Sequence, residues 1–210
     1  MIKPPVLRPG NRVAAVSLSW GGPGLFPHRY NEGKRQLEKA FGVTVVESRH
    51  ALADVAWLAA HPEARASDLM EAFADPSIQA IISTVGGDDS IRLLPFLDFG
   101  LIRNNPKAFL GYSDSTVTHF ACFKAGVVSF YGPSIMAGFG ENGGLFPYMA
   151  AAVRQVLFSK EAPVQVRPNV VVGRMSVLNG LNQSSRINAV NLILVWAGVG
   201  FRGAEFTEAH

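Results

Sequence analysis

The sequence predicts an α/β fold in which a Rossmann-like parallel sheet is covered by helices on both faces. Short apolar runs of β type recur along the chain, and the segments between them carry apolar residues at helical spacing. Strands that alternate with helices in this way form right-handed βαβ units around a parallel sheet. The expected strands are Val13–Leu18, Thr44–Glu47, Ala80–Thr84, Ala108–Gly111 and Val127–Tyr131.

Two of the intervening segments show clear apolar faces at helical spacing. The second of them stops at Asp75-Pro76, because proline cannot continue a helix. The residues that share a face are Tyr30, Gly33, Leu37 and Phe41 in the first segment and Ala66, Leu69, Met70 and Phe73 in the second.

The pattern changes beyond about Pro163. Val164–Val172 is compatible with a strand, Asn179–Asn191 is rich in Asn and Ser, and Leu192–Phe201 is apolar without a clear period. The chain contains no internal repeat. The sequence therefore predicts two parts, residues 1–162 and residues 163–210.

Composition and charge narrow the classes of partner. The net charge is +3, but the basic residues are dispersed and no run exceeds Lys34-Arg35, so the sequence does not favour nucleic-acid binding. The longest apolar run, Leu192–Phe201, is too short to span a bilayer, and the first residues lack a signal-peptide core. A single cysteine, Cys122, suits a packing role in a reducing compartment. We expect a cytoplasmic protein with no membrane partner.

A candidate nucleophile, Ser113, lies where the fourth expected strand turns into a helix-like stretch. A strand-to-helix elbow exposes the serine oxygen and brings backbone N–H groups close to a developing oxyanion. Ser115 occupies the position where an α/β-hydrolase elbow usually has glycine. The alternative is that Ser113, Asp114 or Ser115 caps the following helix.

The pair Gly86-Gly87 follows the third expected strand. It lacks the spacing of a Gly-x-Gly-x-x-Gly fingerprint, and no lysine follows it, so a nucleotide-dependent enzyme is disfavoured. The N–H of Gly87 is a candidate oxyanion donor facing Ser113. A tight turn that requires positive φ is an equally good interpretation.

Several carboxylates lie at or near the same sheet edge: Asp88, Asp89, Asp114 and Glu141. No histidine shares their spacing, so the sequence does not predict a metal site. We expect Asp88 and Asp89 either to be solvated or to bind a cationic group of a substrate. No cofactor is predicted.

Five histidines are candidate bases: His28, His50, His61, His119 and His210. His119 is six residues beyond Ser113, so we expect it to point away from the elbow on a helix face. His50 follows a strand end and is the best internal candidate, although a loop histidine without a function is the commoner case.

Together, these motifs resemble the LD-carboxypeptidase family of serine peptidases over roughly residues 3 to 160. Some of the motifs are more similar to the microcin C resistance branch of this family than to its murein branch. The shared motifs are Lys3-Pro4-Pro5, Leu7-Arg8-Pro9-Gly10, Glu71–Pro76, Ala80–Ser90 and Gly111-Tyr112-Ser113-Asp114; the branch-specific ones are Gly86–Asp89 together with Ser129–Pro133, and Glu141–Gly144.

The resemblance implies a two-domain cytoplasmic hydrolase, often a homodimer, with a Ser-His-Glu triad and no metal or organic cofactor. It maps the nucleophile onto Ser113 and the oxyanion donors onto the N–H groups of Gly87 and Asp114. Gly86, Asp88 and Asp89 are expected to line the substrate site. The murein branch releases a terminal D-alanine from a diamino acid, and the microcin branch cuts the amide between an acidic aminoacyl group and a nucleotide-like moiety. The expected partner is thus a small peptide or an aminoacyl nucleotide.

The resemblance stops before the end of the chain. In the family the triad glutamate and histidine come from a C-terminal domain, and neither role can be assigned to Glu205, Glu208 or His210. We expect residues 1–162 to form the N-terminal α/β domain and residues 163–210 to be a truncated or frame-altered remnant of the linker and C-terminal domain. The expected activity is weak or absent, and the alternative function is that of a non-catalytic remnant that only binds ligand.

Overall fold

The computed structural model describes residues 1–160 and 195–197 of the chain. In this part, five strands form a parallel sheet in the order β2-β1-β3-β4-β5, and a sixth strand pairs antiparallel with β5. The predicted α/β fold is confirmed. The strands are β1 (Arg12–Val16), β2 (Thr44–Glu47), β3 (Ala80–Ser83), β4 (Ala108–Gly111), β5 (Ser129–Tyr131) and β6 (Val195–Ala197).

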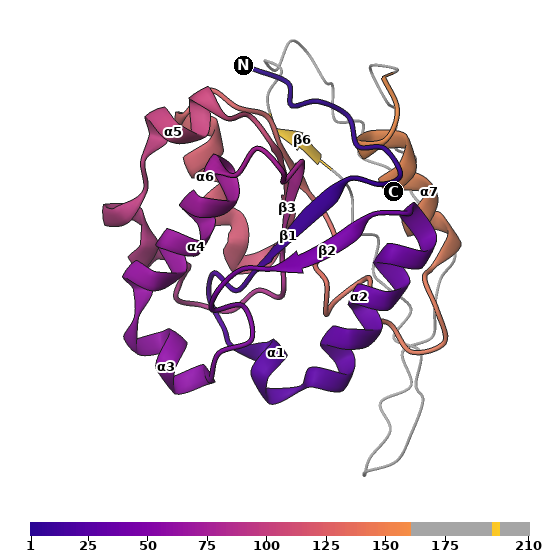
Figure 1. Cartoon of the computed structure of the whole chain (residues 1–210), viewed down its shortest axis with the longest axis horizontal. Coiled ribbons are helices and arrows are strands. Elements are labelled where there is room, and N and C mark those ends of the chain that lie inside the picture. The colour runs from indigo at the N-terminus through magenta and orange to yellow at the C-terminus, as the bar shows by residue number, and fades with distance from the viewer. Residues whose placement is uncertain (161–194, 198–210) are drawn as a thin grey trace, which may run out of the picture.

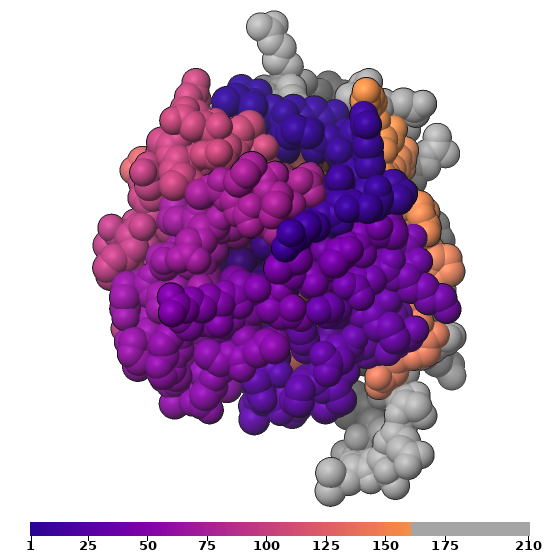
Figure 2. Space-filling model, viewed as in Figure 1, coloured from indigo at the N-terminus to yellow at the C-terminus, as the bar shows by residue number. Residues whose placement is uncertain are grey.

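Helices cover both faces of the sheet (Figure 1). The helices α2 and α7 pack on one face, and α4, α5 and α6 pack on the other. In the space-filling view the N-terminal half of the chain forms most of the visible surface, with α7 at its rim (Figure 2). The helices are α1 (Gly22–Leu25), α2 (Pro27–Phe41), α3 (Val55–Ala60), α4 (Pro62–Ala74), η1 (Ser90–Phe96), α5 (Phe99–Asn104), η2 (Ser113–Ser115), α6 (Thr116–Lys124) and α7 (Pro147–Leu157).

The core is divided by the sheet into two layers, as the alternation of side chains along a strand requires. In β1, Val13 and Ala15 contact the α2 and α7 layer, whereas Ala14 and Val16 contact the layer of α4, α5 and α6. All four are buried. The sequence of a central parallel strand is therefore a continuous apolar run, because both faces of the strand are buried.

Both predicted helix faces are confirmed. In α2 the four expected residues are buried, and the helix ends where Gly42 adopts φ 68°, a left-handed conformation that favours glycine. In α4 Ala66, Leu69 and Phe73 are buried. Arg65, on the same face, is also wholly buried, which the apolar pattern did not predict.

Some expectations fall on residues outside the described part. They are the strand at Val164–Val172, the segment Asn179–Asn191, and the division at residue 162. Leu192–Phe201 is described only at β6. Among the described helices, none is long and apolar enough to cross a membrane.

Candidate active site

Ser113 lies two residues beyond the end of β4, in the first position of η2. Its φ is 60°, and among the described residues it is the non-glycine residue with positive φ. Its side chain is exposed, and Oγ makes no hydrogen bond to another described residue. A left-handed backbone conformation costs free energy in a residue that has a side chain, and such residues cluster at functional sites.

Three hydrogen bonds hold the elbow in this conformation. The N–H of Ser113 donates to the hydroxyl of Tyr131 at 3.0 Å. The hydroxyl of Ser115 donates to the carbonyl of Tyr112 at 2.7 Å, and that of Thr116 donates to the carbonyl of Ser113 at 2.5 Å. Neither η2 nor α6 has a side-chain cap, so the interpretation of Ser113, Asp114 or Ser115 as a helix cap is wrong.

The loop after β3 packs directly against this elbow, because β3 and β4 are neighbours in the sheet. A Cβ added at Gly86 would lie 2.9 Å from Cβ and 3.0 Å from Oγ of Ser113. Gly87 has φ 157°, and a Cβ there would lie 2.1 Å from Oγ of Ser19. The two glycines therefore allow three loops to meet: Gly86 lies against Ser113, and Gly87, which has the positive φ of the turn interpretation, lies against Ser19.

Asp114 ties the two loops together through its side chain. Its Oδ2 accepts from the N–H groups of Asp89 at 3.0 Å and Ser90 at 2.7 Å, and its carbonyl accepts from the Ser90 hydroxyl at 2.7 Å. Burial acts to raise the pKa of Asp114, but hydrogen bonds from Ser19, Ser90 and Asp89 outweigh it and hold this pKa below its usual value. Asp114 is thus a carboxylate anchor for the diglycine loop.

This anchor leaves two backbone N–H groups at the elbow. The N–H of Asp114 lies in the first turn of η2, where a helix supplies no internal acceptor. The N–H of Gly87 donates to no described group, and Gly87 is exposed. Both belong to the loops that meet at Ser113.

The two neighbouring carboxylates differ in their surroundings. Asp88 is exposed. Asp89 accepts from Arg65 at 2.8 Å and from Arg92 at 3.3 Å. The exposed Asp88 is compatible with the solvated position expected from the sequence, whereas Asp89 is partly buried and paired with two arginines.

The histidines of the described part have other partners or positions. His119 is buried, with Nε2 2.9 Å from the Gly111 carbonyl and Nδ1 2.9 Å from the Ser129 hydroxyl. Burial lowers the pKa of His119 to about 4, so it is neutral at pH 7. The expectation of a helix-face residue pointing away is wrong, because its ring turns inward and supports the end of β4.

His50 pairs with a carboxylate away from the elbow loops. Its Nδ1 lies 2.9 Å from Oδ1 of Asp68, and its ring stacks on Trp57. His61 stacks on the same indole and contacts the Trp57 carbonyl. His210 lies outside the described residues. His28 is exposed, and its ring lies edge-on to that of Phe26 with the centroids 6.3 Å apart. We therefore assign no base to Ser113 within the described part of the chain.

The remaining candidates have no reactive setting. Cys122 is wholly buried, and burial raises the pKa of its thiol to about 12, as expected for a packing residue. In the described ranges no three His, Cys, Asp or Glu side chains form a group that would hold a metal ion.

The sequence assigned no role to three residues that shape the site: Ser19, Arg65 and Tyr131. The signal for Arg65 was its spacing, since it lies four residues before Leu69 on the buried face of α4. Ser19 and Tyr131 had a weaker signal: each follows or ends a strand at the edge where ligands of parallel sheets bind.

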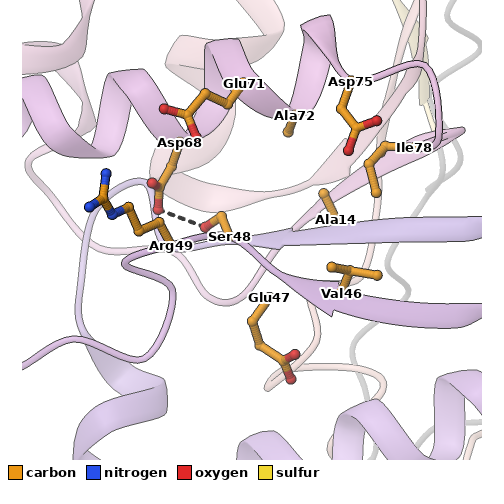
Figure 3. Close-up of a pocket in the computed structure, with 10 residues that line it drawn as sticks. All are labelled: Ala14, Val46, Glu47, Ser48, Arg49, Asp68, Glu71, Ala72, Asp75 and Ile78. Atoms are coloured by element: carbon orange, nitrogen blue, oxygen red, sulfur yellow. Dashed lines mark hydrogen bonds between the residues drawn. The ribbon is translucent and has the colours of Figure 1, made fainter.

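A separate cavity of about 340 Å³ lies beside the edge strand β2, between β2 and α4 (Figure 3). Apolar side chains of β1 and β2 line part of it, and the Ser48 hydroxyl donates to Asp68 within it at 2.7 Å. None of the predicted site residues lines it. Its lining comprises Ala14, Val46, Glu47, Ser48, Arg49, Asp68, Glu71, Ala72, Asp75 and Ile78.

Fold and site define an α/β protein that exposes a serine at a strained strand-to-helix elbow, opposite a diglycine loop. The chain belongs to the LD-carboxypeptidase family: the model of the LD-carboxypeptidase N-terminal domain matches residues 13–132.

Curated relatives include a putative carboxypeptidase of Vibrio cholerae, 33% identical over 133 residues, which are 63% of this chain and 40% of the relative. The microcin C7 self-immunity protein MccF of Escherichia coli is 39% identical over 101 residues, 48% of this chain and 29% of MccF. A probable murein peptide carboxypeptidase of Bacillus subtilis is 35% identical over 106 residues, 50% of this chain and 33% of that protein. The matches thus span at most about two fifths of these relatives.

Solved structures show the same fold. Wild-type MccF without ligand has a TM-score of 0.71 and 29% identity, over 77% of this chain and 48% of that chain. An MccF-like protein of Streptococcus pneumoniae in complex with AMP has a TM-score of 0.66 and 32% identity, over 72% of this chain and 46% of that chain.

Proposed function

We propose that this chain carries the nucleophile and oxyanion site of a serine peptidase or amidase of the LD-carboxypeptidase type. The observation that carries the proposal is the exposed hydroxyl of Ser113 at φ 60°, which packs against Gly86 and has no hydrogen-bond partner among the described residues. Family membership supports it, since the matched domain includes both loops.

The chemistry would proceed by acyl transfer. Oγ of Ser113 attacks the carbonyl carbon of an amide, and its proton passes to a base. The N–H groups of Gly87 and Asp114 donate to the oxyanion of the tetrahedral intermediate. The C–N bond then breaks, the amine leaves with a proton, and water hydrolyses the acyl-enzyme.

We propose that the substrate is a processed microcin C-like aminoacyl nucleotide or a murein peptide. MccF in complex with aspartyl sulfamoyl adenosine supports the first class, and the murein peptide carboxypeptidases among the relatives support the second. A homodimer in the cytoplasm is part of the same proposal. With no base assigned in the described part of the chain, we expect weak hydrolysis or none.

Phosphonylation of Ser113 tests the proposal directly. A fluorophosphonate forms a P–O bond with Oγ while the P–F bond breaks and fluoride leaves. We expect a covalent adduct on the Ser113 peptide by mass spectrometry and none in Ser113→Ala. The second candidate function, ligand binding without catalysis, predicts no adduct and equal affinity of both proteins for an aspartyl sulfamoyl adenosine.

A further inference from the structure

The guanidinium of Arg65 is the most deeply buried charge near the proposed site. Its side chain is 0% exposed, and it lies on α4, outside the loops that meet at Ser113. Burying a guanidinium is costly unless acceptors replace its water, so such a residue needs a specific set of partners.

Those partners belong to two different loops. Nη1 donates to the carbonyls of Leu18 and Ser19, each at 3.0 Å, in the loop after β1. Nη2 donates to the carboxylate of Asp89 at 2.8 Å, in the loop after β3. The planar fork of arginine thus joins the two loops at fixed separation, which a lysine ammonium cannot reproduce.

The joined loops are also in contact beside Gly87. The N–H of Asp89 donates to Oγ of Ser19 at 3.1 Å as well as to Asp114. Gly87 passes so close to Ser19 that a Cβ would overlap its hydroxyl. Any change in the separation of the two loops therefore moves the Gly87 N–H relative to Ser113.

We propose that Arg65 is a positioning residue that sets the place of the Gly87 N–H by clamping the loop after β1 to Asp89. The inference rests on the proposed function for its catalytic meaning and assigns Asp89 to the clamp instead of to substrate. Asp114 binds the same loop through the N–H groups of Asp89 and Ser90, so two charged groups fix the residues that directly follow the diglycine segment.

The test compares Arg65→Lys and Asp89→Asn with Asp88→Asn, a matched loss of charge at the exposed neighbour. The first readout is amide hydrogen exchange of residues 86–90, with residues 80–83 of β3 as internal reference. We expect at least about tenfold faster exchange in the loop for both clamp variants, with the reference and Asp88→Asn unchanged. Equal loop exchange, or equal acceleration in β3, would overturn the proposal and leave Arg65 a contributor to overall stability only.

The second readout is the rate of Ser113 labelling by a small uncharged fluorophosphonate. A probe without a cationic group makes no ion pair with Asp89, so it does not depend on the Asp89 carboxylate for its own binding. Slower labelling in Asp89→Asn therefore supports the clamp, and unchanged labelling contradicts it. Absence of labelling in the wild type would sink the proposed function, whereas the exchange measurement would still decide the role of Arg65.

Discussion

The loops around Ser113 and the cavity beside β2 carry similar polar residues but arrange them in opposite ways. In the cavity, the carboxylate of Asp68 accepts hydrogen bonds from the Ser48 hydroxyl and the His50 N–H, so neighbouring residues satisfy it. At the elbow, the carboxylates of Asp89 and Asp114 hold loops, while the hydroxyl of Ser113, on a strained backbone, forms no hydrogen bond within the described part of the chain. Strain combined with an unpartnered group marks a reactive position better than polar residues alone.

The largest effect expected from this comparison is that of Gly87→Ala. The added Cβ would lie 2.1 Å from Oγ and 2.8 Å from Cβ of Ser19, so the loop after β3 and the loop after β1 must move apart, and the Gly87 N–H is displaced. Losing one oxyanion donor typically costs about 10²-fold or more in rate, and we expect a fall of that size in Ser113 phosphonylation.

A matched control for this variant is Gly10→Ala. Gly10 also has positive φ, 86°, but nothing lies within 4 Å of an added Cβ. It should cost about 1 kcal/mol of stability from backbone strain without changing the labelling rate. Equal labelling of Gly87→Ala and the wild type would contradict the assignment of Gly87 as a donor.

The second prediction concerns the support beneath the elbow. His119 has a pKa of about 4 in the folded state against an ordinary value of 6.5 for histidine, so the unfolded chain binds more protons between these pH values. The free energy of unfolding should therefore fall as the pH is lowered through this window, by up to about 3 kcal/mol. Urea denaturation at several pH values measures the slope.

The variant His119→Asn isolates this contribution. Asparagine does not titrate and keeps a donor and an acceptor near Gly111 and Ser129, so its unfolding free energy should depend less steeply on pH in the same window. Asp114 also loses stabilisation in acid, because its folded pKa is lowered, but that loss comes as the pH falls through its own, lower range. An identical slope in the variant would assign the effect to other groups.

Whether a feature can be predicted from the sequence depends on whether local or distant residues determine it. The strands and the faces of α2 and α4 follow from hydrophobic periodicity, which is local, and the structure confirms them. The burial of Arg65 and His119 depends on acceptors from other elements, the Leu18 and Gly111 carbonyls, and no local pattern contains those. The positive φ of Ser113 is likewise imposed by its surroundings, since serine has no intrinsic preference for it.

The third prediction tests one of those surroundings, the Tyr131 hydroxyl. Its removal in Tyr131→Phe deletes the hydrogen bond to the Ser113 N–H and leaves the ring in place. A single hydrogen bond of this kind is worth about 1 kcal/mol, so labelling of Ser113 should slow by up to about tenfold. An unchanged rate in a variant with normal unfolding would show that the elbow keeps its conformation without Tyr131.

The smallest expected effect is on stability and separates strain from reactivity at Ser113 itself. A non-glycine residue in the left-handed region costs about 1–2 kcal/mol, whereas glycine adopts this region freely. The free energy of unfolding of Ser113→Gly should therefore exceed that of the wild type by about 1 kcal/mol. Ser113→Ala keeps the Cβ and with it the strain, and should not gain. Both variants lose the adduct. If glycine and alanine gave equal unfolding free energies, the elbow would hold no strain at Ser113, and its free hydroxyl alone would distinguish it from the cavity beside β2.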